Sequence, residues 1–192
     1  MRQVFFDTET TGLEADKGDR IIEIGCVEMV DRQLTGNNLH LYINPERASH
    51  EDALRVHGLT EAFLSDKPKF AEIVDPLLAF LAGAELVIHN APFDIGFVNA
   101  ELRRLKRGVL TDHVGGVRDT LLMARDLFPG KANSLDALCR RLRGYFDDGE
   151  ALAVDDVRTA VFRSRRGRRA YAEGPVDALL ARAVEVMVTA PD

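Results

Sequence analysis

Two carboxylates, Asp7 and Glu9, stand two residues apart directly after the apolar run Val4–Phe6. The run is typical of a buried strand, and residues i and i+2 of a strand point to the same side, so both side chains should project together from its carboxyl end. Neighbouring carboxylates repel each other unless a cation lies between them. Such oxygen ligands suit a hard divalent ion, Mg²⁺ or Mn²⁺. The alternative is a solvated strand end followed by a polar turn.

Two further acids are expected at comparable places. Asp94 follows the short apolar run 86–88 at the start of an expected helix, and Asp177 lies in the first turn of the last expected helix. Loops beyond strand ends are the usual location of a site in α/β sheets. Together with Asp7 and Glu9, these acids would suit a two-metal phosphodiester hydrolase, in which one ion activates a water and both stabilise developing charge. Both added acids could also simply favour helix N-termini.

The elements that must position these acids begin with strands. Residues 21–30 and 39–44 alternate as strands, and the segment 32–38 between them is rich in turn residues, so the first three strands are expected to form an antiparallel meander. In the second strand the alternation predicts one face of Ile22, Ile24, Cys26 and Val30, and an opposite face of Glu23 and Gly25. A further short strand is expected at 86–88.

Helical spacing of apolar residues dominates the rest of the chain. A kink or a restart is expected at Pro76, which lies inside one of these runs. The expected helical segments are 49–58 (opened by Ser49), a brief turn from Thr60, 70–81, 95–105, 120–128, one capped by Ser134, and one from Pro175 to Val188. Strands followed by alternating helices predict an α/β fold with a mixed sheet flanked by helices, in one domain spanning 1–192.

Composition narrows the class of protein. The chain has 192 residues, 46% of them hydrophobic, and a formal net charge of −6, which argues against binding nucleic acid by net charge alone. A nuclease stays possible, because bound metal ions can offset an acidic cluster. Cys26 and Cys139 suggest neither a disulfide framework nor a zinc site, and no apolar stretch approaches transmembrane length. A cytoplasmic protein with no membrane partner is the expectation.

Several motifs resemble those of a known family. Three of them are similar to the DEDD superfamily of 3′–5′ exonucleases: Phe6–Gly12, Ile21–Gly25 and His89–Phe97. Four more look like the family of proofreading epsilon subunits of bacterial DNA polymerase III: Leu34–Asn38, Val56–Leu59, Phe128–Lys131 and Asn133–Cys139. The resemblance is dense from about residue 3 to 142.

The resemblance implies a ribonuclease-H-like fold and release of deoxynucleoside monophosphates from a mismatched or single-stranded DNA 3′ end. It implies two divalent ions, Mg²⁺ or Mn²⁺, and the alpha and theta subunits of the polymerase as partners. Asp7, Glu9, Asp94 and Asp177 would be the catalytic metal ligands, with Asp7, Glu9 and Asp177 also contacting substrate. Asp52, His57 and Phe93 would line the pocket of the terminal nucleotide.

The last motif departs from the family pattern. That motif contains a histidine, the general base, five residues before its aspartate, but no histidine follows His113 here. If Asp177 is the matched aspartate, the histidine position holds Ala172. Tyr171 is misplaced for a tyrosine-type variant. The Arg-rich segment of about 143–174 resembles nothing in the family, through divergence or a reading-frame disturbance. The tail by which an epsilon subunit binds its polymerase is also expected to be missing.

Three functions therefore remain open. The first is a DNA exonuclease impaired by loss of its general base. The second is a non-catalytic relic that binds metal, DNA ends or a replisome partner. The third is an RNA-trimming exonuclease of the same superfamily.

Overall fold

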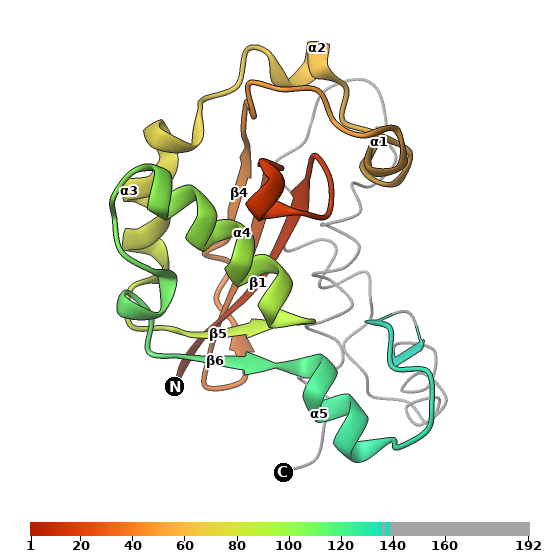
Figure 1. Cartoon of the computed structure of the whole chain (residues 1–192). Helices are drawn as coiled ribbons and strands as arrows, with labels where there is room; N and C mark the ends of the chain where they lie inside the picture. The colour runs from red at the N-terminus through yellow and green to blue at the C-terminus, as the bar shows by residue number, and fades with distance from the viewer. Residues whose placement is uncertain (136, 139–192) are drawn as a thin grey trace.

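The computed structural model describes residues 1–135, 137 and 138, and within them six strands form one mixed sheet (Figure 1). The sheet order is β3-β2-β1-β5-β6, with β4 also paired to β2. The pairs around β2 are antiparallel, whereas β1–β5 and β5–β6 are parallel. The strands are β1 (Arg2–Thr10), β2 (Ile21–Val30), β3 (Gln33–Leu34), β4 (Leu39–Tyr42), β5 (Glu85–Ile88) and β6 (Gly116–Asp119). The expected α/β fold with a mixed sheet is confirmed.

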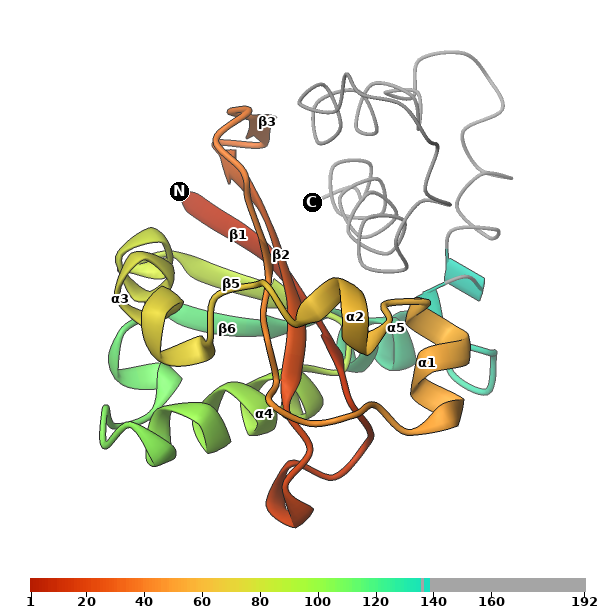
Figure 2. The same cartoon turned by 90° about the horizontal axis from the view of Figure 1, so that it is seen from above.

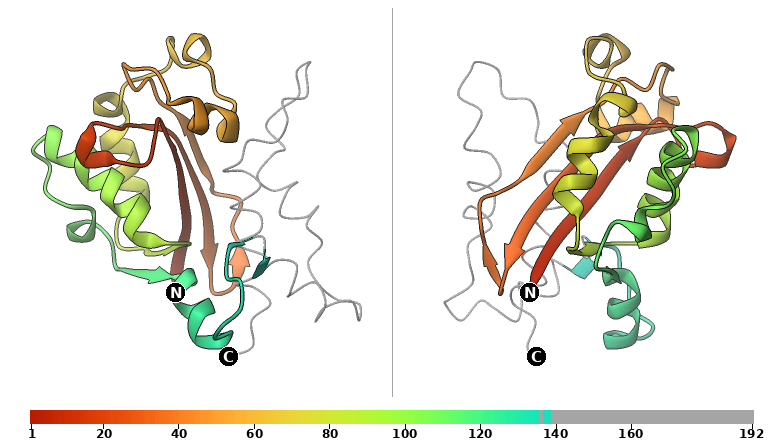
Figure 3. Two further views of the ribbon diagram at one scale, coloured as in Figure 1. Left: turned by 45° about the vertical axis from the view of Figure 1, so that its right-hand side comes forward. Right: turned by 90° about the vertical axis from the view of Figure 1, so that its left-hand side faces the viewer.

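Helices flank this sheet. Two of them, α3 and α4, lie on the same side of it (Figures 2 and 3). None of the helices in the described residues is long and apolar enough to cross a membrane. The helices are α1 (Glu51–His57), α2 (Glu61–Leu64), α3 (Phe70–Leu81), α4 (Ala91–Arg104) and α5 (Thr120–Leu127), with short 3-10 turns η1 (Ala15–Lys17) and η2 (Leu110–Asp112).

The main core forms between the sheet and these two helices. Val4 and Phe6 of β1 pack there with apolar residues of α3 and α4, among them Leu77, Leu81 and Leu102. Because side chains alternate along a strand, the intervening residues Phe5, Asp7 and Glu9 belong to the opposite face of β1. The core on one side thus fixes the carboxylates on the other.

A β-bulge corrects one expectation about β2. Glu9 pairs with Glu23, but the next residue, Thr10, pairs with Ile21, so Ile22 is an extra residue on β2. Its side chain consequently does not share the face of Ile24: Ile24 belongs to the main core, whereas Ile22 packs with residues of the α1–α2 region, Leu59 and Leu64.

Two helical expectations also change. The helix α3 runs through Pro76 rather than restarting there. Pro76 is exposed on the outer side, while buried residues such as Leu77 hold the inner side against the core. The residue at the N-cap of α1 is His50 rather than Ser49. The predicted helix end at Gly58 is confirmed, since Gly58 has a left-handed backbone. The brief turn predicted from Thr60 is also present as α2, where Thr60 accepts the Phe63 N–H.

The strand predictions need two additions. The predicted meander is present, but the connecting segment 32–38 contains β3, which also pairs with β2. The edge strand β6 was not predicted from the sequence. Ser134 accepts the Ala137 N–H at 3.3 Å, as expected of a helix cap. Asp177, the segment 143–174 and the last expected helix lie outside the described residues, so the single-domain organisation stays a prediction.

We expect the core beneath α3 to carry much of the stability. Leu81 and Leu127 are each the last residue of a helix, but Leu81 is fully buried and Leu127 is 66% exposed. Leu81→Ala should lower the free energy of unfolding by about 2–5 kcal/mol, because it leaves a cavity. Leu127→Ala should change it by less than about 0.5 kcal/mol. Urea unfolding of both variants checks this, and equal losses would contradict the packing described.

Candidate active site

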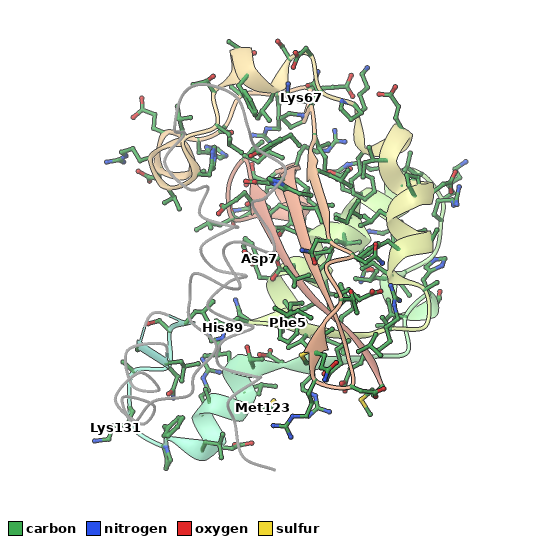
Figure 4. The ribbon with its side chains drawn as sticks, turned by 180° about the vertical axis from the view of Figure 1, so that it is seen from behind. Phe5, Asp7, Lys67, His89, Met123 and Lys131 are labelled. Carbon is green, nitrogen blue, oxygen red and sulfur yellow. The ribbon has the colours of Figure 1, made fainter. Side chains whose placement is uncertain are left out.

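Asp7 is a buried carboxylate close to the end of β1, and only 8% of its surface is exposed. It faces Gly25 of β2 across the antiparallel ladder, so no side chain stands directly opposite it (Figure 4 shows Asp7 in place). Its Oδ2 atom is buried without a hydrogen-bond partner among the described residues. Burial, reinforced by the carboxylates of Asp94 and Glu9, raises the pKa of Asp7 well above its usual range.

Glu9 faces a second acid, Glu23, directly across the same ladder. Burial first, and then the carboxylates of Glu23 and Asp94, raise the pKa of Glu9 to about 7. Glu23 is fully buried, and its Oε1 lies 2.6 Å from Nε2 of His40, while its Oε2 has no hydrogen-bond partner within the described part of the chain. Sequence reasoning missed this residue as part of the site, because its place opposite Glu9 depends on the bulge at Ile22.

Asp94 comes to the site from a different element. It lies in the first turn of α4, is 2% exposed, and its Oδ1 accepts a hydrogen bond from the Thr8 hydroxyl at 2.7 Å. Burial raises the pKa of Asp94 to about 7, the carboxylate of Asp119 adds to the rise, and hydrogen bonds at Thr8 oppose it. This hydrogen bond joins α4 to β1 one residue away from Asp7.

The three predicted acids in the described residues therefore share one electrostatic environment. As their side chains stand, however, no three His, Cys, Asp or Glu residues in the described ranges come close enough to hold a metal ion. The donor set still fits a hard cation, since it consists of carboxylate oxygens and includes the unpartnered Oδ2 of Asp7. Asp177, the fourth predicted ligand, lies outside the described residues.

The turn after Glu9 is held by side-chain hydrogen bonds. The Thr11 hydroxyl accepts the Arg20 N–H at 3.0 Å and donates to buried Asp19 at 3.2 Å, and the His50 N–H donates to the Thr11 carbonyl at 2.8 Å. A Cβ on Gly12 would come within 2.3 Å of Asp19 Oδ2. Any larger residue at position 12 would therefore clash with Asp19, so this loop requires glycine there.

His57 is buried at the end of α1 with one nitrogen occupied. Its Nδ1 accepts the Leu59 N–H at 3.0 Å, so a neutral ring carries its proton on Nε2. That Nε2 is buried with no hydrogen-bond partner among the residues described. Burial lowers the pKa of His57, although the nearby Glu23 carboxylate opposes the shift. His57 is thus a neutral ring whose Nε2–H has no acceptor among the described residues.

The other two predicted pocket residues have different surroundings. Phe93 is half-buried, packs against the main core and stacks at a tilt on Phe97, with ring centroids 4.9 Å apart. Asp52 is exposed in the first turn of α1, where it pairs with Arg55. A pocket shared by Phe93, Asp52 and His57 stays a prediction.

Comparison with known proteins agrees with this arrangement. Residues 4–161 match the profile of the exonuclease (RNase_T) family. The chain belongs to the exonuclease family. Exonuclease-family relatives include the DNA polymerase III epsilon subunits of Pasteurella multocida and of Escherichia coli, each 52% identical over 145 residues, which is 73% of this chain. The chain spans 57% and 60% of the length of these two relatives.

Solved structures of exonucleases share the fold. Exonuclease X, in a complex with 5′ overhanging duplex DNA, superposes with a TM-score of 0.62 and 22% identity, covering 97% of this chain and 90% of that one. The nuclease domain of 3′hExo, a DEDDh family member bound to rAMP, gives a TM-score of 0.62 at 15% identity, covering 78% and 82%. At these identities the likeness establishes the ribonuclease-H-like fold of this exonuclease-family chain.

The raised pKa values predict how the metal-free protein responds to pH. Glu9 and Asp94 have pKa values of about 7 when folded, against about 4 in an unfolded chain. Their contribution to stability is complete below the unfolded values and is lost as pH rises through 7. With EDTA present, the free energy of unfolding should fall between about pH 4 and 7, and Glu9→Gln should make that fall shallower. A stability that rises over this interval would show that the pKa values of these carboxyls are not raised in the folded protein.

Proposed function

We propose that this protein is a metal-dependent 3′–5′ exonuclease that releases deoxynucleoside monophosphates from DNA 3′ ends. The observation that carries the proposal is the buried Asp7 carboxylate at the carboxyl end of β1. One of its oxygens has no hydrogen-bond partner among the described residues, and the charges of Asp94 and Glu9 help to raise its pKa. The family membership and the likeness to epsilon subunits support a proofreading role beside a replicative polymerase.

The cofactor that this site would take is a pair of Mg²⁺ or Mn²⁺ ions. Asp7, Glu9 and Asp94 would hold them, with Asp177 as the fourth ligand suggested by the sequence. Bound divalent ions supply positive charge that stabilises the developing charge of the phosphodiester transition state. Their positive charge would also offset the burial and the neighbouring carboxylates that raise the pKa values of Asp7, Glu9 and Asp94.

The terminal nucleotide would be recognised by residues around this cluster. We propose that His57 donates its Nε2–H to the nucleotide, because burial of an unpaired donor is costly until an acceptor arrives. Phe93 would offer a ring face to the base or sugar, and Asp52 would contribute from the start of α1.

The general-base histidine of the family's last motif has no counterpart in this sequence. No histidine follows His113 in the sequence. His57 is not a substitute, because its Nδ1 is already engaged and its Nε2 carries the proton in the neutral ring. The protein would therefore cleave DNA more slowly than an enzyme with a positioned base, which typically contributes about 10²–10⁴-fold. The same missing histidine favours the second candidate, a non-catalytic relic that binds metal or DNA ends.

The partners proposed follow from the relatives. A DNA 3′ end is the proposed substrate, and the alpha and theta subunits of DNA polymerase III are the proposed protein partners, in the bacterial cytoplasm. An RNA substrate is the alternative within the same superfamily, and a side-by-side comparison of DNA and RNA primers would separate the two.

Release of mononucleotides from an end-labelled DNA primer with a 3′ mismatch tests the proposed activity. With Mn²⁺ or Mg²⁺ we expect slow release whose rate rises with pH as hydroxide becomes available, and Asp7→Asn should reduce it to background. The relic would be favoured by no release at any pH while Mn²⁺ still stabilises the protein through Asp7.

The same release assay also tests whether the missing general base limits the rate. Ala172→His should raise the rate at neutral pH and flatten its dependence on pH. A wild-type rate that is already fast at pH 7 would show that another residue acts as the base.

The donor role of His57 predicts a loss of nucleotide affinity. His57→Ala should weaken dAMP binding in the presence of Mn²⁺ about 10–100-fold, since a lost hydrogen bond to a charged group is worth about 1.5–3 kcal/mol. Val56→Ala is the matched control on the same helix, because Val56 is 67% exposed. Calorimetric titration measures both, and equal affinities for the two variants would remove His57 from the pocket.

A further inference from the structure

Asp119 ends β6, and its carboxylate accepts backbone N–H groups from the starts of two helices. Its Oδ1 accepts from Leu121 at 2.8 Å and from Leu122 at 3.3 Å, which caps α5. The same carboxylate reaches the start of α4, where Oδ1 accepts from Asn90 at 3.3 Å and Oδ2 accepts from Ala91 at 3.1 Å. One side chain thus caps α5 and ties it to the first turn of α4.

The start of α4 depends on this support. Asn90, the N-cap residue, has a left-handed backbone with φ of 71° and makes no capping hydrogen bond with its own side chain. A non-glycine residue holds such a conformation only where its surroundings fix it. The hydrogen bonds from Asn90 and Ala91 to Asp119 provide that fixation.

The geometry of α4 matters because Asp94 lies in its first turn. A helix turn moves as a unit, so any shift of Ala91 also shifts Asp94 relative to Asp7. Asp119 lies next to the site by sheet register as well, since its Cα pairs with that of Ile88 at the end of the parallel strand β5. His89, which follows β5 (labelled in Figure 4), joins the two strand ends through a 3.0 Å contact between its Nδ1 and the Thr120 hydroxyl.

We infer that Asp119 is a positioning residue for the carboxylate site: through the first turn of α4 it sets where Asp94 stands relative to Asp7. The hydrogen bonds that Asp119 makes to the start of α4 come from the backbone of Asn90 and Ala91. Asp119 therefore acts on Asp94 through this backbone. The role rests on the proposed metal-dependent function and adds a residue that sequence reasoning did not include. An acid directly before the helix at Thr120 was the available signal.

A helix cap with no role in the site would behave differently, and the chain offers a matched control. Glu72 is an exposed acid that accepts the Lys69 N–H at 2.7 Å at the start of α3. Glu72→Ala therefore removes one negative charge and one helix-start hydrogen bond elsewhere in the fold. Asp119→Asn keeps the shape and one acceptor oxygen, which protects the test if Asp119→Ala does not fold.

The experiment measures Mn²⁺ binding by calorimetry on the full chain at pH 8, well below the unfolding temperature of each variant. Mutating a residue that orients a metal ligand typically lowers the affinity for the metal about 10–100-fold. We expect Asp119→Ala to weaken Mn²⁺ binding about tenfold or more, Asp119→Asn to weaken it by a smaller factor, and Glu72→Ala to leave it within about twofold. Wild-type affinity in both Asp119 variants, or an equal loss in Glu72→Ala, would overturn the inference.

A second measurement separates this role from the proposed function. Amide hydrogen exchange of the metal-free protein should quicken from Asn90 through Asp94 in the Asp119 variants and stay unchanged there in Glu72→Ala. If wild-type protein binds no Mn²⁺, the proposed function fails, and the exchange of this turn still decides the positioning role. Unchanged exchange at Asp94 in both Asp119 variants would refute it.

Discussion

The burial of several neighbouring carboxylates is the constraint around which this molecule is arranged. Asp7, Glu9 and Glu23 lie on one face of the β1–β2 ladder, and Asp94 approaches from α4. Each acid would prefer water, and burial together with the neighbouring carboxylates raises the pKa values of Asp7 and Glu9. The free-energy cost of burying these acids must be offset by packing elsewhere, here in the core that β1 shares with α3 and α4.

The supports of the site are spread over the chain rather than concentrated in one motif. The turn after Glu9 is fixed by Thr11 and Asp19, and the start of α4 by Asp119. Each support uses side-chain acceptors for backbone N–H groups near a strand end, where the sheet no longer supplies hydrogen bonds. The site is thereby held in place before any ligand arrives, which lowers the ordering cost of binding.

Alternation and helical spacing predicted most of the fold. They placed the main strands, the three longer helices and the pair Asp7 and Glu9, because these features depend on local periodicity. They missed the β-bulge that turns the Ile22 side chain to the other face of the sheet, because the bulge arises only when β2 pairs with β1. They missed β6 because four residues with one exposed apolar side chain carry no period. The burial of Glu23 depends on its neighbours across the sheet, and the roles of Asp52, Phe93 and Asp177 lie beyond what local patterns decide.

The mixed topology of the sheet has a kinetic consequence. β1 and β2 are antiparallel neighbours joined by residues 11–20, so Asp7, Glu9 and Glu23 can meet early in folding through a short loop. β5 pairs with β1 only after residues 11–84 have been bridged, and Asp94 arrives with the helix that follows. Closing the longer loop costs more entropy, and parallel pairing is slow to form. The last carboxylate therefore joins the cluster late, so a cation held by all of them would act mainly by slowing unfolding rather than by hastening folding.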